Sequence, residues 1–194
     1  MSVPIIKNDN FLDAPAWDAL SDYFKNTATF KYGWYSAKEV SEFTHWYIDF
    51  LNQSSANQDN YEHVLYGNPA YKVIADVWTK LKAFHLLGHS LVRCYAHAHT
   101  YGVEGAPHTD SQIDGNFTTI IYVNPEWKSE WAGETVFFNP AGELTQAILP
   151  KPNRMITFDG TQLHAVRALA RICPALRITL MFKTKAPSAA VSKS

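Results

Sequence analysis

The segment Pro107-His108-Thr109-Asp110 carries two side chains that can bind one metal ion. Alternate residues of an extended chain lie on the same side, so the imidazole of His108 and the carboxylate of Asp110 can converge on one point. His164, much later in the chain, can supply a second imidazole. Two neutral nitrogens and one carboxylate on one side of a metal form the facial triad that binds non-haem Fe(II) and leaves other positions open. We therefore expect His108, Asp110 and His164 to be iron ligands.

A His-x-Asp pair is weak evidence alone, because such pairs also occur in ordinary turns. Its surroundings favour a metal site, since Pro107 and the loop residues before it place His108 at the entry of an extended segment. Apolar runs typical of strands follow at residues 117–123, 135–138, 154–158 and 177–182. The chain thus presents a ligand pair, strands, a second histidine, and a last strand that begins at Arg177.

Composition limits the architecture and the kinds of partner. The 194 residues, 46% of them hydrophobic, suffice for one substantial core, and two domains would be cramped. We expect one domain over residues 1–185, with residues 1–89 as mainly helical support and residues 90–185 as the core. Residues 186–194 are small and polar and are expected to form a disordered tail. A net charge of -1 argues against binding to nucleic acid or an anionic membrane.

The sequence also indicates a reducing, cytoplasmic environment. The first residues lack the apolar core of a signal peptide, and no stretch is apolar for long enough to span a bilayer. Cys94 and Cys173 show no Cys-x-x-Cys spacing and lie in or beside apolar runs, so we expect both to be buried free thiols.

The first half reads as mostly helical. Mixed apolar residues predict a helix over residues 11–26, and apolar residues after Pro69 recur with helical spacing up to Gly88. A capping-box pattern at Ser36 and Glu39, followed by an apolar stripe, predicts another helix over residues 36–51. The polar residues 53–60 indicate a loop.

The period changes at residue 90. Residues 91–98 alternate in polarity, and short extended runs follow up to Lys183. Helices followed by strands indicate an α+β fold, and eight short antiparallel strands can close as a double-stranded β-helix, or jelly roll, with room inside for a ligand.

Residues 93–183 resemble the catalytic core of the prolyl-hydroxylase branch of the Fe(II)/2-oxoglutarate-dependent dioxygenases. The resemblance covers about half of the chain and rests on the order and spacing of short blocks. These are Cys-Tyr at 94–95, His-Thr-Asp at 108–110, Ile-Tyr-Val-Asn at 121–124, Gly-Glu-Thr-Val-Phe-Phe at 133–138, Arg-Met-Ile-Thr-Phe at 154–158, His-Ala-Val at 164–166 and Arg-Ile-Thr-Leu at 177–180.

The resemblance implies a role for each matching residue. The His-x-Asp pair and His164 would bind Fe(II), and Arg177 would bind the far carboxylate of 2-oxoglutarate. Tyr95 and Tyr122 would offer hydroxyl groups to that co-substrate, and Thr179 would add one from the same strand face as Arg177. A guanidinium suits this role because its donors match a carboxylate in geometry.

The chain departs from the family pattern after His164. Arg177 lies further from that histidine than is usual in the family, and residues 172–175 look like a small insertion. Arg171 and Arg167 are therefore rivals for the 2-oxoglutarate carboxylate. Arg177 is preferred because it opens an apolar run, whereas the other two are expected to be loop charges.

The activity that the resemblance implies is hydroxylation of an unactivated C–H bond. O2 and 2-oxoglutarate would be co-substrates, succinate and CO2 products, and ascorbate a further cofactor. The carboxylate of Asp110 favours hydroxylation over halogenation, because halogenating relatives have a small residue there. The substrate would be a prolyl residue, a free amino acid or a small natural-product intermediate, and the oligomeric state cannot be read from the sequence.

Two other functions compete with this one. His97, His99 and Glu104 partly match a cupin metal motif, which would indicate a metal-dependent isomerase, hydrolase or binding protein. The second competing function is that of a non-catalytic jelly-roll module in which the triad is accidental.

Trp127 and Trp131 lie in a charged loop and would either anchor it or form a rim over the pocket.

Overall fold

The computed structural model describes residues 4–35, 44–51 and 60–187. Its helices are α1 (Ala14–Asp22), a π-helical turn (Tyr23–Thr27), α2 (Glu62–Gly67) and α3 (Lys72–Phe84), with short 3-10 turns at Pro69–Tyr71 and Ser129–Trp131. Its strands are β1 (Ile6–Asn8), β2 (Lys31–Trp34), β3 (His45–Asp49), β4 (Ser90–His99), β5 (Asn116–Tyr122), β6 (Thr135–Phe138), β7 (Leu144–Ile148), β8 (Met155–Asp159), β9 (His164–Val166) and β10 (Arg177–Lys185).

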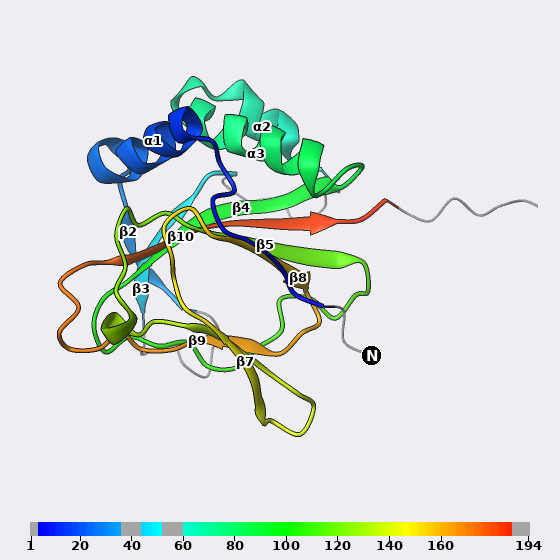
Figure 1. Ribbon diagram of the computed structural model, residues 1–194. Coiled ribbons are helices and arrows are strands. Elements are labelled where there is room, and N and C mark those ends of the chain that lie inside the picture. The colour runs from blue at the N-terminus through cyan, green and yellow to red at the C-terminus, as the bar shows by residue number, and fades with distance from the viewer. Residues whose placement is uncertain (1–3, 36–43, 52–59, 188–194) are drawn as a thin grey trace, which may run out of the picture.

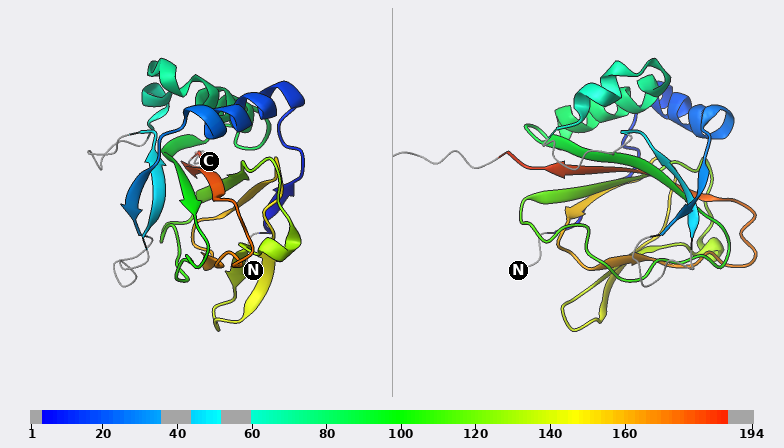
Figure 2. Two further views of the ribbon diagram at one scale, coloured as in Figure 1. Left: turned by 90° about the vertical axis from the view of Figure 1, so that its left-hand side faces the viewer. Right: turned by 180° about the vertical axis from the view of Figure 1, so that it is seen from behind.

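The strands form two antiparallel sheets that face each other. The larger sheet has the order β1-β8-β5-β10-β4-β3-β2, and the smaller sheet has the order β7-β6-β9. Figure 1 shows the smaller sheet below the larger sheet and the helices above the larger sheet. The side views place these helices on one side of the larger sheet (Figure 2). The expected α+β jelly roll with supporting helices is therefore confirmed.

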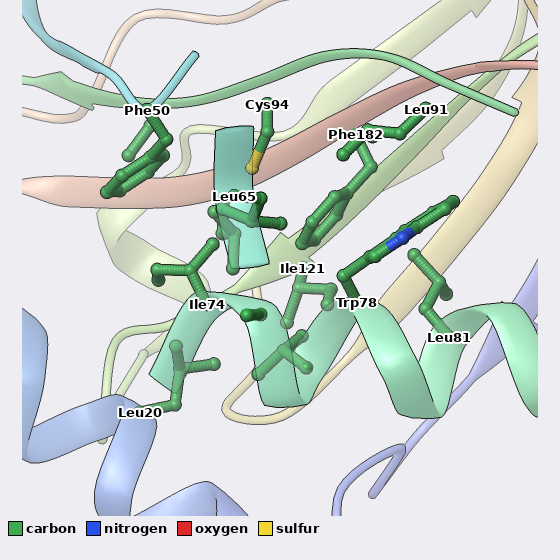
Figure 3. Close-up of a cluster of buried hydrophobic side chains, with 14 of the residues drawn as sticks. Leu20, Phe50, Leu65, Ile74, Trp78, Leu81, Leu91, Cys94, Ile121 and Phe182 are labelled. Carbon is green, nitrogen blue, oxygen red and sulfur yellow. The ribbon is translucent and has the colours of Figure 1, made fainter. Parts of the chain in front are cut away.

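The largest hydrophobic core lies between the helices and the outer face of the larger sheet. Trp78 of α3 stacks on Phe182 of β10 with ring centroids 5.7 Å apart, and both side chains are fully buried. Figure 3 shows them together with Leu81, Leu91 and Ile121. Truncating a buried aromatic side chain such as Trp78 to alanine typically costs about 3–5 kcal/mol. This layer holds β10 and β4 in place, and their opposite faces point into the molecule.

Strand alternation divides β10 between two environments. Leu180 and Phe182 belong to the core under the helices, whereas Arg177, Thr179 and Lys183 line a cavity between the sheets. The two sets alternate because successive side chains of a strand point to opposite faces. The fold thus presents three polar side chains of one strand to the interior.

Several expected elements are confirmed in the described part of the chain. The helix expected over residues 11–26 is α1 with its π-helical turn, and the apolar stripe after Pro69 belongs to α3. The runs expected as strands correspond to β4, β5, β6, β8 and β10. Cys94 and Cys173 are free and buried, as expected.

The helix expected over residues 36–51 is wrong where it can be examined. Residues 45–49 form strand β3, which pairs with β4 through Tyr47 opposite His97. Pairing with an existing sheet satisfies the backbone, and the aromatic residues of this segment suit a strand. The first half is also less helical than expected, because it contributes β1 and β2 as well.

Other expectations lie wholly or mostly outside the described residues. These are the first part of that helix at 36–43, the loop at 53–60 and most of the tail at 186–194. Within the described chain, no helix combines the length and the apolar character needed to cross a membrane.

Candidate metal centre and its cavity

Backbone hydrogen bonds bring His108 and His164 side by side. The amide of His108 donates to the carbonyl of His164 at 2.9 Å, and the amide of His164 donates back at 3.0 Å. The amide of Asp110 donates to the carbonyl of Gly160 at 2.8 Å, in the turn between β8 and β9. The loop after β4 therefore runs along β9, which places the three residues predicted as ligands at one point of the cavity.

The donor atoms of this triad face one another. The Nε2 atoms of His108 and His164 each lie 3.6 Å from a carboxylate oxygen of Asp110. One donor atom from each residue falls within 4.8 Å of the other two, a spacing that allows all three to bind one metal ion. In the described part of the chain, no other group of His, Cys, Asp and Glu residues meets this spacing.

Hydrogen bonds to the backbone orient both imidazoles. Nδ1 of His108 lies 2.9 Å from the carbonyl of Ala106, and Nδ1 of His164 lies 2.9 Å from the carbonyl of Gln162. A carbonyl can only accept, so each Nδ1 carries a proton, and in the neutral imidazole the lone pair is left on Nε2, the nitrogen that faces Asp110. This is the second-shell arrangement that metal-binding histidines usually show. The donor set, two imidazole nitrogens and a carboxylate, therefore fits Fe(II).

The carboxylate of Asp110 has two further partners. Thr118 of β5 donates its hydroxyl to Oδ2 at 2.5 Å, and the ammonium of Lys183 lies 2.5 Å from Oδ1. Burial alone would raise the pKa of Asp110, but the His108 imidazole and the Lys183 charge hold that pKa well below its usual range. The group is therefore ionised and anchored on both oxygens.

The pKa values of the two histidines are shifted in opposite directions. Burial lowers the pKa of His164 to about 4, so this imidazole is neutral near pH 7. Burial would also lower the pKa of His108, but the Asp110 carboxylate and the Ala106 carbonyl raise it above its usual value.

Arg177 lies deep in the cavity wall. It is 2% exposed, its Nε donates to the carbonyl of Gly133 at 2.6 Å, and an amino group donates to the hydroxyl of Thr135 at 2.9 Å. Gly133 has a φ of +78°, and a side chain there would meet the Cδ of Arg177 at 3.2 Å. The backbone at this point therefore needs glycine both for its conformation and for the close approach of the arginine.

The other residues predicted to bind the co-substrate fall into two groups. Tyr95 and Thr179 line the cavity together with Arg177. Tyr122 lies beside them, with its hydroxyl 2.7 Å from that of Thr135 and its ring 5.3 Å from the guanidinium carbon of Arg177. Its contacts are thus with the groups that orient Arg177.

The cavity that contains these groups has a volume of about 240 Å³. Its lining comes from both sheets and from the loop after β4. The residues are Trp34, Arg93, Tyr95, His97, His99, His108, Thr109, Asp110, Ile120, Thr135, His164, Ala165, Val166, Arg177, Thr179, Met181 and Lys183. One cavity therefore contains the triad and a buried guanidinium.

Sequence reasoning missed several polar or aromatic residues of this site, Thr118, Lys183, Arg93 and Trp34 among them. Thr118 and Lys183 hold the Asp110 carboxylate, and Arg93 and Trp34 line the cavity. Strand alternation could have predicted that Lys183 faces the cavity, since it follows Arg177 and Thr179 at even spacing on one strand.

The competing cupin-like site is not assembled. His97 and His99 line the cavity, but Glu104 is exposed and does not form a metal-binding group with them in the described structure. Arg167 and Arg171 are exposed, as expected for loop charges.

The two loop tryptophans are anchors. Trp127 donates its indole N–H to the carbonyl of Ala132 at 3.0 Å, and Trp131 packs in a small core with Leu169 and Cys173. The anchoring interpretation is therefore confirmed, and the loop that ends at Gly133 is fixed next to Arg177.

Comparison with known proteins agrees with this geometry. Residues 94–182 match the model of the 2OG-Fe(II) oxygenase superfamily. No curated protein matches the chain in sequence.

Solved structures share the fold at low sequence identity. A prolyl hydroxylase from Trichoplax adhaerens, in complex with a hypoxia inducible factor peptide fragment, is 14% identical, with a TM-score of 0.65 over 93% of this chain and 83% of that one. A prolyl-4-hydroxylase from Pseudomonas putida is 13% identical, with a TM-score of 0.63 over 94% and 92%. The collagen prolyl hydroxylase of Paramecium Bursaria Chlorella virus-1 is 15% identical, with a TM-score of 0.59 over 94% and 96%. Residues 94–182 thus match the 2OG-Fe(II) oxygenase superfamily model, and the chain shares the fold of prolyl hydroxylases.

Proposed function

We propose that the protein hydroxylates an unactivated C–H bond of a prolyl residue, a free amino acid or a small natural-product intermediate. The observation that carries this proposal is the convergence of the His108, Asp110 and His164 donor atoms within 4.8 Å, in the same cavity as the buried Arg177. The prolyl hydroxylases among its structural neighbours support a prolyl residue as one candidate.

The roles of the residues follow from their positions. His108, Asp110 and His164 would hold Fe(II), and Arg177 would bind the far carboxylate of 2-oxoglutarate through the guanidinium donors that Gly133 and Thr135 leave free. Tyr95 and Thr179 would offer hydroxyl groups to the same co-substrate. When bound, the iron would supply the redox chemistry by which O2 converts a C–H bond to C–OH while 2-oxoglutarate becomes succinate and CO2.

The protein's own contribution would be binding, orientation and exclusion of water. The carbonyls of Ala106 and Gln162 hold each imidazole with Nε2 facing the metal position. Asp110 fills the third protein position, and this favours hydroxylation, since halogenation needs that position free for a halide.

The test is the formation of succinate from 2-oxoglutarate by the purified protein. We expect the reaction to require Fe(II) and O2 and to be lost in His108→Ala and in Asp110→Ala. His63→Ala, at an exposed position of α2, is the matched control and should keep the activity.

Iron binding that survived the simultaneous loss of His108 and His164 would overturn the assignment of the metal ligands and favour the site at His97 and His99. Failure to bind any divalent ion at micromolar concentration would favour a non-catalytic module. The same assay is run with and without ascorbate, which we expect to prolong succinate formation.

A further inference from the structure

The lining of the cavity carries more positive than negative charge. It contains Arg93, Arg177 and Lys183, whereas Asp110 is its one carboxylate among the described residues. A divalent ion at the triad would add positive charge, and the dianion 2-oxoglutarate would offset only part of the total. An unbalanced charge in a partly enclosed cavity favours a second anionic ligand.

Arg93 is the cation in this lining that has no polar partner among the described residues. Lys183 is bonded to Asp110, and Arg177 to Gly133 and Thr135. In the described structure, the guanidinium of Arg93 takes part in no hydrogen bond and no ion pair. Its contacts are with two aromatic faces, at 5.3 Å from the ring centre of Trp34 and 5.0 Å from that of Tyr95.

Aromatic contacts of this kind hold a guanidinium without using its N–H groups. Cation–π attraction acts on the face of the planar group, while its donors point outward from the edge. A side chain held in this way is ready to bind a carboxylate through two parallel hydrogen bonds. Arg93 is therefore prepared for a ligand that the protein itself does not provide.

The strand register places Arg93 and Arg177 at opposite ends of the cavity. Strands β4 and β10 lie side by side (Figure 1), with Arg177 opposite His99 and Lys183 opposite Arg93. Lys183 reaches the triad through Asp110, so the triad lies near the Arg93 end of the ladder. A co-substrate on Arg177 and a second ligand on Arg93 would approach the triad from different ends.

We propose that the substrate is a small carboxylic acid whose carboxylate is bound by Arg93, with its body against Trp34 and Tyr95 and its reacting carbon directed at the triad. This inference rests on the proposed function and narrows its substrate class. His97 adds a polar group beside the anchor: its ring centre lies 4.7 Å from that of Tyr95, and its buried Nε2 has no partner in the described structure. The cavity volume of about 240 Å³ lies below the range of about 300–1,000 Å³ usual for small-molecule sites, which favours a compact ligand.

The experiment uses the full chain with Fe(II) and 2-oxoglutarate. Succinate formation is measured with a panel of free L-amino acids, N-acetyl-L-amino acids and aliphatic hydroxy acids, each paired with its carboxamide. The same compounds are titrated by calorimetry into protein loaded with Mn(II) and 2-oxoglutarate. We expect at least one acid to bind and to stimulate turnover, while its amide does neither. Arg93→Gln should weaken binding of that acid about ten- to hundred-fold, since a hydrogen-bonded charge pair is lost.

The arms separate failure of this inference from failure of the proposed function. Arg171→Gln, an exposed loop arginine, should behave as the wild type. Equal binding of acid and amide, an unchanged affinity in Arg93→Gln, or no binding by any acid of the panel would each overturn the inference. Succinate formation that is independent of Fe(II), or that persists in His108→Ala and Asp110→Ala, would overturn the proposed function, whereas the calorimetric comparison of acid with amide would still decide the role of Arg93.

Discussion

The ammonium of Lys183 lies 2.5 Å from Oδ1 of Asp110, so the carboxylate of the triad already has a cation bonded to it in the absence of metal. The side chain of Asp110 is 4% exposed and that of Lys183 is 16% exposed. A buried carboxylate without a partner would be costly, and Lys183 removes this cost in the metal-free protein. The same charge opposes a divalent ion at the triad, because like charges at this range repel one another.

Lys183→Met should therefore destabilise the metal-free protein and tighten its binding of metal. We expect the free energy of unfolding to fall by about 3 kcal/mol, because the substitution leaves a buried carboxylate unpaired. Mn(II) should stabilise the variant more than the wild type, so the difference between their free energies of unfolding should be smaller with Mn(II) than without it. Denaturant unfolding with and without Mn(II) measures both effects. Lys185→Met, exposed on the same strand, is the control, and an Mn(II) affinity lower in Lys183→Met than in the wild type would refute this role.

The hydroxyl of Thr118 should matter for metal binding and that of Thr119 should not. Both residues are buried on β5 and both hydroxyls are hydrogen-bonded, Thr118 to Asp110 and Thr119 to Thr157. Each threonine-to-valine change should cost about 1 kcal/mol of stability through the lost hydrogen bond. Thr118→Val should also weaken Mn(II) binding about 10- to 100-fold, the usual effect of losing an outer-shell partner. Equal Mn(II) affinities of the two variants, measured by calorimetry, would contradict the prediction.

The chemistry-bearing residues were easier to predict than the surfaces around them. His108, Asp110 and His164 have distinctive types, and the strand pattern between them is regular enough to suggest that they meet. Trp34 comes from a strand far away in sequence, and only the order β10-β4-β3-β2 brings it near Arg93. Long-range packing of this kind leaves no local periodicity to read.

The error over residues 45–49 has a related cause. The apolar residues of this segment fit helical spacing, and a capping-box pattern precedes them. Tyr47 and Ile48 also favour a strand, and local propensity differs too little to decide between the two. Pairing with Ala96 and His97 of β4 decides the outcome, and that pairing is a tertiary interaction.

Arg177→Lys should raise the KM for 2-oxoglutarate. Lysine keeps the charge but loses the paired donors and the contacts with Gly133 and Thr135, so we expect about a 10- to 100-fold increase. The KM is obtained from initial rates of succinate formation at varied 2-oxoglutarate. Arg171→Lys, at the exposed rival position, should leave the KM unchanged. The opposite pattern, with Arg171 as the sensitive position, would transfer the role to the loop.

His45 should make the protein less stable as the pH falls from 7 to 5. Burial lowers the pKa of His45 to about 4, and the rings of His97 and His99 on β4 lie 4.5 and 4.4 Å from its own. Burial also lowers the pKa of His97 and of His99 well below the usual value, so all three imidazoles are neutral near pH 7. The positive charge of Arg177, close to His99, lowers the pKa of that histidine as well.

The direction of this change in stability with pH follows from the number of protons that the folded and unfolded chains bind. Between the pKa of unfolded histidine, about 6.5, and the folded value, the unfolded chain binds more protons, so its population rises as the pH falls. The contribution of His45 is complete above pH 6.5 and is lost progressively toward pH 4, which amounts to about 2 kcal/mol between pH 7 and 5. Urea unfolding at both pH values should show a smaller difference in His45→Gln than in the wild type. His63→Gln, an exposed histidine, should retain the wild-type difference, and the same pH dependence in all three proteins would rule out a contribution from His45.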